Sequence, residues 1–118
     1  MISRALAAAS TRPMILAILQ DGENYGYQII QRVKDLSGGT IEWSDGMLYP
    51  VLHRLEKENL ILSCWKMSQG GRHRKYYTLT VQGKESLVKD MQEWLNVHRV
   101  LTSLWDPSLM GRFQPSGG

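Results

Sequence analysis

The sequence predicts a mainly α fold with a small β-hairpin (α+β), arranged as a winged helix-turn-helix domain followed by a long C-terminal helix. Three features of the chain support this prediction. Residues 44–58 have the spacing of a short amphipathic helix, and residues 61–79 form two strand-like runs around a Gly-Gly turn rich in cations. Residues 81–105 then return to sustained helical spacing. A helix followed by a hairpin with a basic tip is the layout of a winged helix-turn-helix.

The length of 118 residues allows one modest core and leaves no room for a large enclosed active site. We expect residues 1–80 to form the winged helix-turn-helix and residues 81–105 to form a C-terminal dimerisation helix. Residues 106–118 are rich in Gly, Pro and Ser and have no periodicity, so we expect a flexible tail there.

The net charge of +3 and the pI near 9.2 make the chain mildly basic, which alone says little about its partners. The distribution says more, because seven Lys/Arg and only two acids lie between His53 and Lys84. A solvated basic face is the plainest interpretation of such a cluster, but the hairpin context favours contact with a polyanion. The seven cations are Arg54, Lys57, Lys66, Arg72, Arg74, Lys75 and Lys84.

The one cysteine, Cys64, lies in an apolar run and is expected to be buried in a strand. It cannot form an intramolecular disulfide, which favours a reducing compartment. No apolar stretch reaches membrane-spanning length, and the N-terminal residues lack the pattern of a secretory signal. We therefore expect a cytoplasmic protein.

Two helices are expected in the N-terminal third of the chain. The first covers about residues 11–20, with Pro13 in its first turn, and the residues before it form either a separate helical arm or a kinked continuation. The second covers residues 25–37 and ends at the glycine pair 38–39. Residues 40–43 are expected to form an extended link or a minor strand. The inward side chains of the second helix are expected to be Tyr27, Ile29, Ile30 and Val33.

The third helix, residues 44–58, begins at Ser44, whose hydroxyl suits an N-cap. Asp45 follows in the first turn, where a negative charge favours the helix dipole. Pro50 removes one backbone hydrogen bond and is expected to bend the early turns. Three leucines recur at helical spacing and define the buried face: Leu48, Leu52 and Leu55.

The opposite face of this helix is expected to enter the major groove of DNA. There His53 and Arg54 can donate hydrogen bonds to base edges or phosphate, and the Tyr49 hydroxyl can reach phosphate. The hairpin tip, residues 70–75, would lie along the neighbouring backbone or minor groove. The candidate DNA-binding residues are Ser44, Asp45, Gly46, Tyr49, His53, Arg54, Lys57, Arg72, His73, Arg74 and Lys75.

Six residues of the last helix step by four, three, four, three and four positions, which is a heptad-like seam. They are Leu87, Met91, Trp94, His98, Leu101 and Trp105. Further apolar side chains widen this face, so we expect it to pair with the same stripe of a second copy and form a homodimer. The alternative is that the helix folds back onto its own domain. We interpret His98 as an interface residue rather than a ligand or pH switch.

Several of these segments together resemble the PadR family of bacterial transcriptional regulators. The matching segments open the second helix (24–29), lie in the third (48–56) and cover the hairpin turn and second strand (70–80), with Gly83 beyond them. In this order they cover roughly residues 13–105. The resemblance implies a double-stranded DNA-binding regulator that holds an inverted-repeat operator as a homodimer. A small chain with no evident polymerase-contacting region is more simply a repressor than an activator.

The region around Trp94 resembles the smaller family members with one C-terminal helix, including multidrug-binding repressors. In those proteins a matching tryptophan stacks on flat cationic or aromatic ligands at the dimer centre. The resemblance therefore implies a ligand pocket at Trp94, Met91 and His98, and release from DNA by a flat aromatic effector. The chain departs from that pattern at Arg12 and Pro13, and His98 replaces an acidic residue, so a cationic ligand would lose a negative partner.

An enzyme is not expected. The three histidines lie on separate elements, and the chain has no nucleophile elbow, phosphate loop or metal-spaced cluster. No cofactor and no metal are therefore predicted. The alternative function is a winged-helix protein-interaction or RNA-binding module, because the same fold serves both roles. RNA recognition usually stacks bases on exposed aromatics, whereas most aromatics here fall on apolar stripes.

Overall fold

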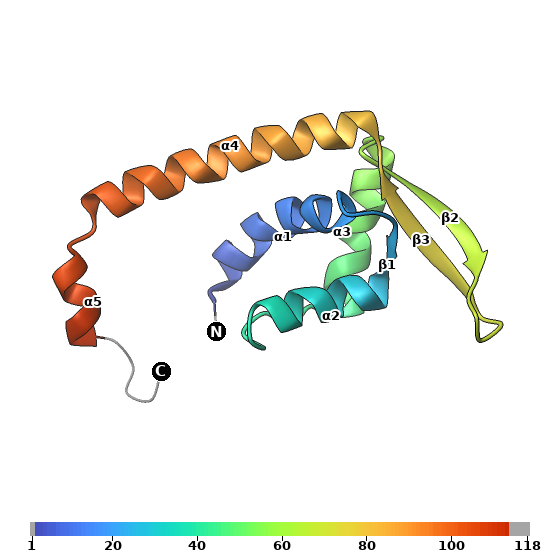
Figure 1. Ribbon diagram of the computed structural model, residues 1–118, viewed down its shortest axis with the longest axis horizontal. Coiled ribbons are helices and arrows are strands. Elements are labelled where there is room, and N and C mark those ends of the chain that lie inside the picture. The colour runs from blue at the N-terminus through green and yellow to red at the C-terminus, as the bar shows by residue number, and fades with distance from the viewer. Residues whose placement is uncertain (1, 114–118) are drawn as a thin grey trace.

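The computed structural model describes residues 2–113, and it confirms the predicted fold class: mostly helical, with a small antiparallel sheet. Three helices form the body, the hairpin projects from one end, and the last long helix runs across α1 and beyond it (Figure 1). In chain order the elements are α1 (Arg4–Leu19), β1 (Asn24–Tyr25), α2 (Gly26–Leu36), α3 (Asp45–Lys57), β2 (Ile61–Met67), β3 (His73–Leu79), α4 (Val81–Leu104) and α5 (Pro107–Phe113).

The first helix begins seven residues earlier than the predicted start near residue 11. Ser3 caps it, because its Oγ accepts a hydrogen bond from the backbone N–H of Leu6 at 3.3 Å. Pro13 therefore lies inside α1 rather than in its first turn. The segment before residue 11 is a continuation of the same helix, not a separate arm.

The second helix buries Ile29 and Val33 as predicted, but Tyr27 is 65% exposed, so its predicted inward placement was wrong. Residues 40–43 do not form a strand. A two-residue strand forms at β1 instead, and it pairs antiparallel with β3 through Asn24 opposite Tyr77 and Tyr25 opposite Tyr76. The sheet therefore has three strands in the order β1-β3-β2.

A single apolar core joins the helices to the base of the hairpin. The three leucines predicted for the inner face of α3 are all in it. Full burial of a leucine or isoleucine side chain contributes about 1.5–3 kcal/mol each, so this cluster is the main stabilising feature of the domain. Its members are Ile15, Leu16, Ile18, Leu19, Ile29, Val33, Trp43, Leu48, Leu52, Leu55, Ile61, Tyr77 and Leu87.

The second strand of the hairpin, β3, starts at His73 opposite Met67, inside the segment predicted as the hairpin tip (residues 70–75). The turn closes through the backbone N–H of Ser68, which donates to the carbonyl of Arg72 at 2.7 Å, and Gly71 supplies a positive φ of 79°. Cys64 is exposed on this hairpin, which corrects the prediction of a buried cysteine.

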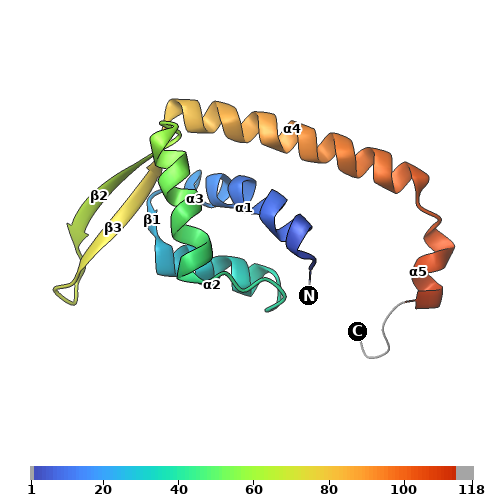
Figure 2. The same cartoon turned by 180° about the vertical axis from the view of Figure 1, so that it is seen from behind.

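The long helix α4 is capped by Thr80, whose Oγ1 accepts from the backbone N–H of Gly83 at 2.9 Å. Leu87, predicted for the dimer seam, is 3% exposed in the chain's own core and is removed from the candidate dimer contacts. From Met91 onwards α4 is exposed on every side and projects away from the body, as the view from behind shows (Figure 2).

Residues 107–113 were predicted to be a loose tail, but they form the short helix α5. Asp106 begins it, since its carboxylate accepts hydrogen bonds from the backbone N–H and hydroxyl of Ser108 at 3.0 and 2.8 Å. These hydrogen bonds hold the pKa of Asp106 below its usual range. The remainder of the predicted tail, residues 114–118, lies outside the described residues. Among residues 2–113, no helix has the length and apolarity needed to cross a membrane.

Candidate nucleic-acid interface

The outer face of α3 is built by the local sequence as predicted. Ser44 acts as the N-cap, because its Oγ accepts from the backbone N–H of Met47 at 3.2 Å. With its leucines turned into the core, the helix presents all seven candidate residues to solvent. These are Ser44, Asp45, Gly46, Tyr49, His53, Arg54 and Lys57.

Tyr49 is held in place by the start of α2. A Cβ atom built on Gly26 would lie 2.5 Å from the Tyr49 hydroxyl oxygen and 2.9 Å from its ring carbon Cζ. A side chain at residue 26 would displace the Tyr49 ring, so the glycine allows this close approach. The contact joins the two helices of the helix-turn-helix at the surface.

The β2–β3 hairpin is the wing of the fold. Its cations divide between the two faces of this two-stranded ribbon, because successive strand residues point to opposite sides. His73 and Lys75 lie opposite Met67 and Trp65 on the face that turns toward α3. Arg74 lies on the other face, with its guanidinium carbon 4.3 Å from the ring centroid of Tyr25. Arg74 and Lys75 therefore belong to strand β3 rather than to the loop in which they were predicted.

Glu56 connects the wing to α3. Its carboxylate accepts a short hydrogen bond from the Ser63 hydroxyl on β2 and lies 3.8 Å from the Lys75 ammonium on β3. One carboxylate on α3 thus contacts both strands of the hairpin. This fixes the wing beside the outer face of α3 and leaves Arg72 and His73 exposed at the tip.

Between α3 and the wing lies a concave surface, whose hollow has a volume of about 770 Å³. It brings Tyr49 and His53 together with the four wing candidates, whereas Ser44, Asp45, Gly46, Arg54 and Lys57 lie outside it. Apart from Tyr49, prediction from sequence missed its aromatic members, because an aromatic residue gives no local signal that separates a surface position from a core position. The lining residues are Tyr25, Gly26, Tyr27, Tyr49, His53, Trp65, Arg72, His73, Arg74, Lys75 and Tyr77.

Two ionisable groups near this surface have shifted pKa values. Burial raises the pKa of Tyr77 to about 12, with smaller contributions from Tyr49 and Glu56, so its hydroxyl stays neutral at physiological pH. Lys66 lies on the opposite face of the wing and contacts both carboxylate oxygens of Glu23 at 2.6 and 2.7 Å, which raises its pKa. Lys66 is therefore paired within the domain.

The seam of α4 lies far along the chain from this concave surface and contributes nothing to its lining. Met91, Trp94 and Leu101 are exposed apolar side chains on the projecting part of α4, and Trp94 is the least exposed of the three at 38%. Trp105 is also exposed, and so is His98. Among the described residues, no three His, Cys, Asp or Glu side chains gather closely enough to hold a metal ion.

Residues 15–89 match the transcriptional regulator PadR-like family, a span that includes α2, α3, the whole wing and the first part of α4. The chain belongs to the PadR-like family of transcriptional regulators. It is therefore a DNA-binding regulator at the level of its family, and the members of that family are regulators rather than enzymes. The match ends before Met91, Trp94 and His98, so the proposed ligand residues lie beyond it.

Individual relatives agree with this assignment. The chain is 36% identical over 87 residues to transcriptional regulator Rv3488 of Mycobacterium tuberculosis, covering 74% of this chain and 78% of the relative. A PadR family transcription regulator from Clostridium difficile superposes with a TM-score of 0.71 at 34% identity, covering 80% of this chain and 96% of that one. A transcriptional regulator from Clostridium thermocellum shares the fold, with a TM-score of 0.81 at 24% identity over 90% of this PadR-like chain and 100% of that chain.

Proposed function

We propose that this PadR-like protein is a repressor that binds an inverted-repeat operator as a homodimer. The observation that carries the proposal is the concave surface between α3 and the wing, where donors from both elements face the same space. In this proposal His53 reads base edges in the major groove and Arg72 and His73 contact the adjacent phosphates, and the exposure of all three side chains supports it. An operator-binding role places the protein in the cytoplasm with the chromosome.

The homodimer is supported by the exposed apolar face of α4. Met91, Leu101 and Trp105 stay exposed in the single chain, as do the flanking Leu95, Val97, Val100 and Leu104. A contiguous apolar face of this kind marks an interaction surface. Two copies joined along it would present two α3 helices about 34 Å apart, the separation of successive major-groove sites on one face of DNA. Repression follows because a dimer bound at an operator blocks access of other proteins to that segment.

A flat aromatic effector is the second part of the proposal. Trp94 presents an indole at the seam with Met91 and His98 close to it along α4, and an indole at a dimer seam can stack on a flat apolar molecule. Planar aromatic compounds added to a protein–operator complex should then quench tryptophan fluorescence and release the DNA. Replacing Trp94 with alanine should abolish the release at protein concentrations at which the variant still forms the dimer and binds the operator.

Wing and helix substitutions test the DNA contacts separately. Replacing Arg72 and Arg74 together with glutamine should weaken binding to every duplex and reduce the slope of log affinity against log salt by about two, because each phosphate contact contributes about one unit. Replacing His53 with alanine should instead change the preference among sequences, by about 1–3 kcal/mol at the affected base pair. Titrations against an operator selected from random DNA and against a scrambled duplex measure both effects.

The matched control is Lys66→Gln, a wing cation that lies opposite Arg74 on the same face of the ribbon and whose charge is already paired with Glu23. It should change neither the affinity nor the salt slope appreciably. Unchanged affinity in the Arg72/Arg74 double variant would refute the wing assignment, and a uniform loss in the His53 variant would refute its role in sequence preference.

A further inference from the structure

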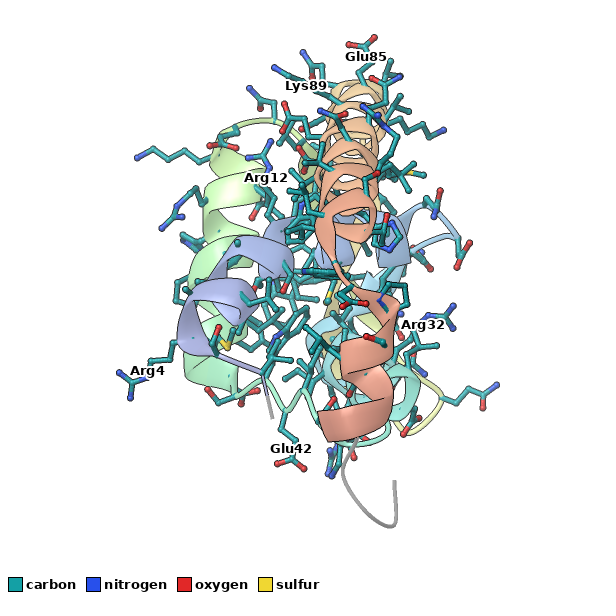
Figure 3. The ribbon with its side chains drawn as sticks, turned by 90° about the vertical axis from the view of Figure 1, so that its left-hand side faces the viewer. Arg4, Arg12, Arg32, Glu42, Glu85 and Lys89 are labelled. Atoms are coloured by element: carbon teal, nitrogen blue, oxygen red, sulfur yellow. The ribbon has the colours of Figure 1, made fainter. Side chains whose placement is uncertain are left out.

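Arg12 on α1 contacts two other helices at once. Its Nη1 lies 3.1 Å from the carboxylate of Glu58, the residue that ends α3. Its Nη2 donates to the Ser86 hydroxyl at 2.7 Å, and its Nε lies 3.4 Å from the Asp90 carboxylate, both on α4. Figure 3 shows Arg12 between α3 and α4, whereas Glu85 and Lys89 point from α4 away from the body. One planar guanidinium thus connects the recognition helix to the dimerisation helix.

These contacts lie where α4 leaves the domain. Asp90 is the last partly buried residue of α4, with a side chain 17% exposed, and every residue from Met91 to Gly111 is exposed. The start of α4 is anchored by Gly83 and Leu87, which are buried. Arg12 therefore contacts α4 at the last position where this helix packs against the domain, about one turn beyond Leu87.

The charges favour this arrangement. Glu58 lies at the C-terminal end of α3, where the helix dipole disfavours a carboxylate, and Asp90 is mostly removed from water. A cation between the two carboxylates offsets both costs. Arginine suits the position because its fork carries donors in several directions in one plane, whereas the ammonium of lysine would act as a single point charge.

We propose that Arg12 is a positioning residue that sets the direction of α4 relative to α3, and thereby the separation of the two recognition helices in the dimer. The link to DNA rests on the proposed function, whereas the link between Arg12 and the direction of α4 does not. About 14 residues of α4 follow Asp90, which is about 21 Å of helix, so a tilt of about 10° at the pivot displaces the far end by about 4 Å. That displacement exceeds the rise of one base pair, about 3.4 Å.

The direction of α4 can be measured in solution without DNA. Nitroxide labels on the natural Cys64 of β2 and on a Ser103→Cys variant report the distance between the wing and the end of α4. Cys64 is exposed, and Ser103 lies on the side of α4 opposite the seam. Diluting the labelled chain into excess unlabelled Cys64→Ser chain leaves only distances within one chain, whatever the oligomeric state. Pulsed electron paramagnetic resonance then gives the distance distribution.

We expect a narrow distribution for the otherwise unchanged chain and a distribution about twice as wide, or shifted by about 4 Å, for Arg12→Met. Arg12→Lys should resemble Arg12→Met. The control is Arg32→Met, which loses one cation and one ion pair (Arg32–Asp21, 3.5 Å) without touching α4, and it should match the unchanged chain. A distribution in Arg12→Met equal to that of the unchanged chain overturns the proposal, as does equal broadening in Arg32→Met. Circular dichroism confirms that the variants are folded.

The consequence for DNA is tested with duplexes that the unchanged chain selects from a random library. One base pair inserted or removed between the half-sites should weaken binding of the unchanged chain about tenfold, and binding of Arg12→Met by less than about threefold. Equal discrimination in both proteins overturns the link to operator spacing. Absence of any selected duplex refutes the proposed function instead, and the distance measurement still decides the role of Arg12.

Discussion

Replacing Gly83 with alanine is expected to lower the free energy of unfolding by about 3 kcal/mol. A Cβ atom at this position would lie 2.1 Å from the carbonyl oxygen of Leu60 and 2.6 Å from a methyl carbon of Leu79. The Leu60 carbonyl cannot move freely, because it accepts hydrogen bonds from the backbone and the hydroxyl of Thr80, each at 3.0 Å. The overlap should outweigh the gain in helix propensity, about 1 kcal/mol.

Urea denaturation at equal protomer concentrations measures this loss, and a fall in Tm of about 10 °C or more should accompany it. The control is Gly46→Ala in α3, where the nearest atom to the added Cβ is Ser44 Oγ at 3.9 Å. That variant should be as stable as the parent or gain about 0.5 kcal/mol. If Gly83→Ala unfolds at the same urea concentration as the parent, the close packing of α4 on the base of the hairpin is contradicted.

Replacing Leu101 with glutamate is expected to convert the proposed dimer to a monomer at micromolar concentration. Leu101 lies in the centre of the exposed apolar face of α4, and a carboxylate brought into that face by a partner would be unpaired and desolvated. The cost of about 3 kcal/mol raises the dissociation constant of the dimer about 100-fold. Affinity for an inverted-repeat duplex should fall as well, because the two half-sites would then be bound independently.

Ser103→Glu is the matched control, since it adds the same charge two residues along on the opposite side of α4. Sedimentation velocity over a range of concentrations should show a dimer for this variant and for the parent. A Leu101→Glu variant that sediments as a dimer would show that α4 is not the dimerisation element.

Features with a complete local signal were predictable from sequence. The third helix was predicted because Ser44 supplies an N-cap and three leucines supply the helical period, and both act within the segment itself. The length of α1 was misjudged because Pro13 reads as a first-turn residue, although the helix tolerates it in its interior. The strand β1 was not predicted, because two residues are too few to show an alternating pattern. It forms only through its pairing with Tyr76 and Tyr77, which lie about 50 residues away.

Most residues of the site could be predicted from the sequence, but the contacts between residues of different elements could not. Hydrophobic periodicity assigns an apolar or aromatic residue to a face without stating what covers that face, which is why Tyr27 and Cys64 were expected to be buried. The same ambiguity placed Leu87 in a dimer seam, although the chain's own core covers it. The contacts of Glu56 with the wing and of Arg12 with α4 join residues from different elements, and only the fold brings them together.

Selection of bound duplexes from random DNA by the purified protein tests the central claim most directly. The claim is that two copies hold two α3 helices and two wings against one face of DNA. It predicts recovery of an inverted repeat whose half-sites are about 10 base pairs apart, centre to centre. Recovery of a single unpaired site, or no enrichment of any sequence at low ionic strength, would contradict it.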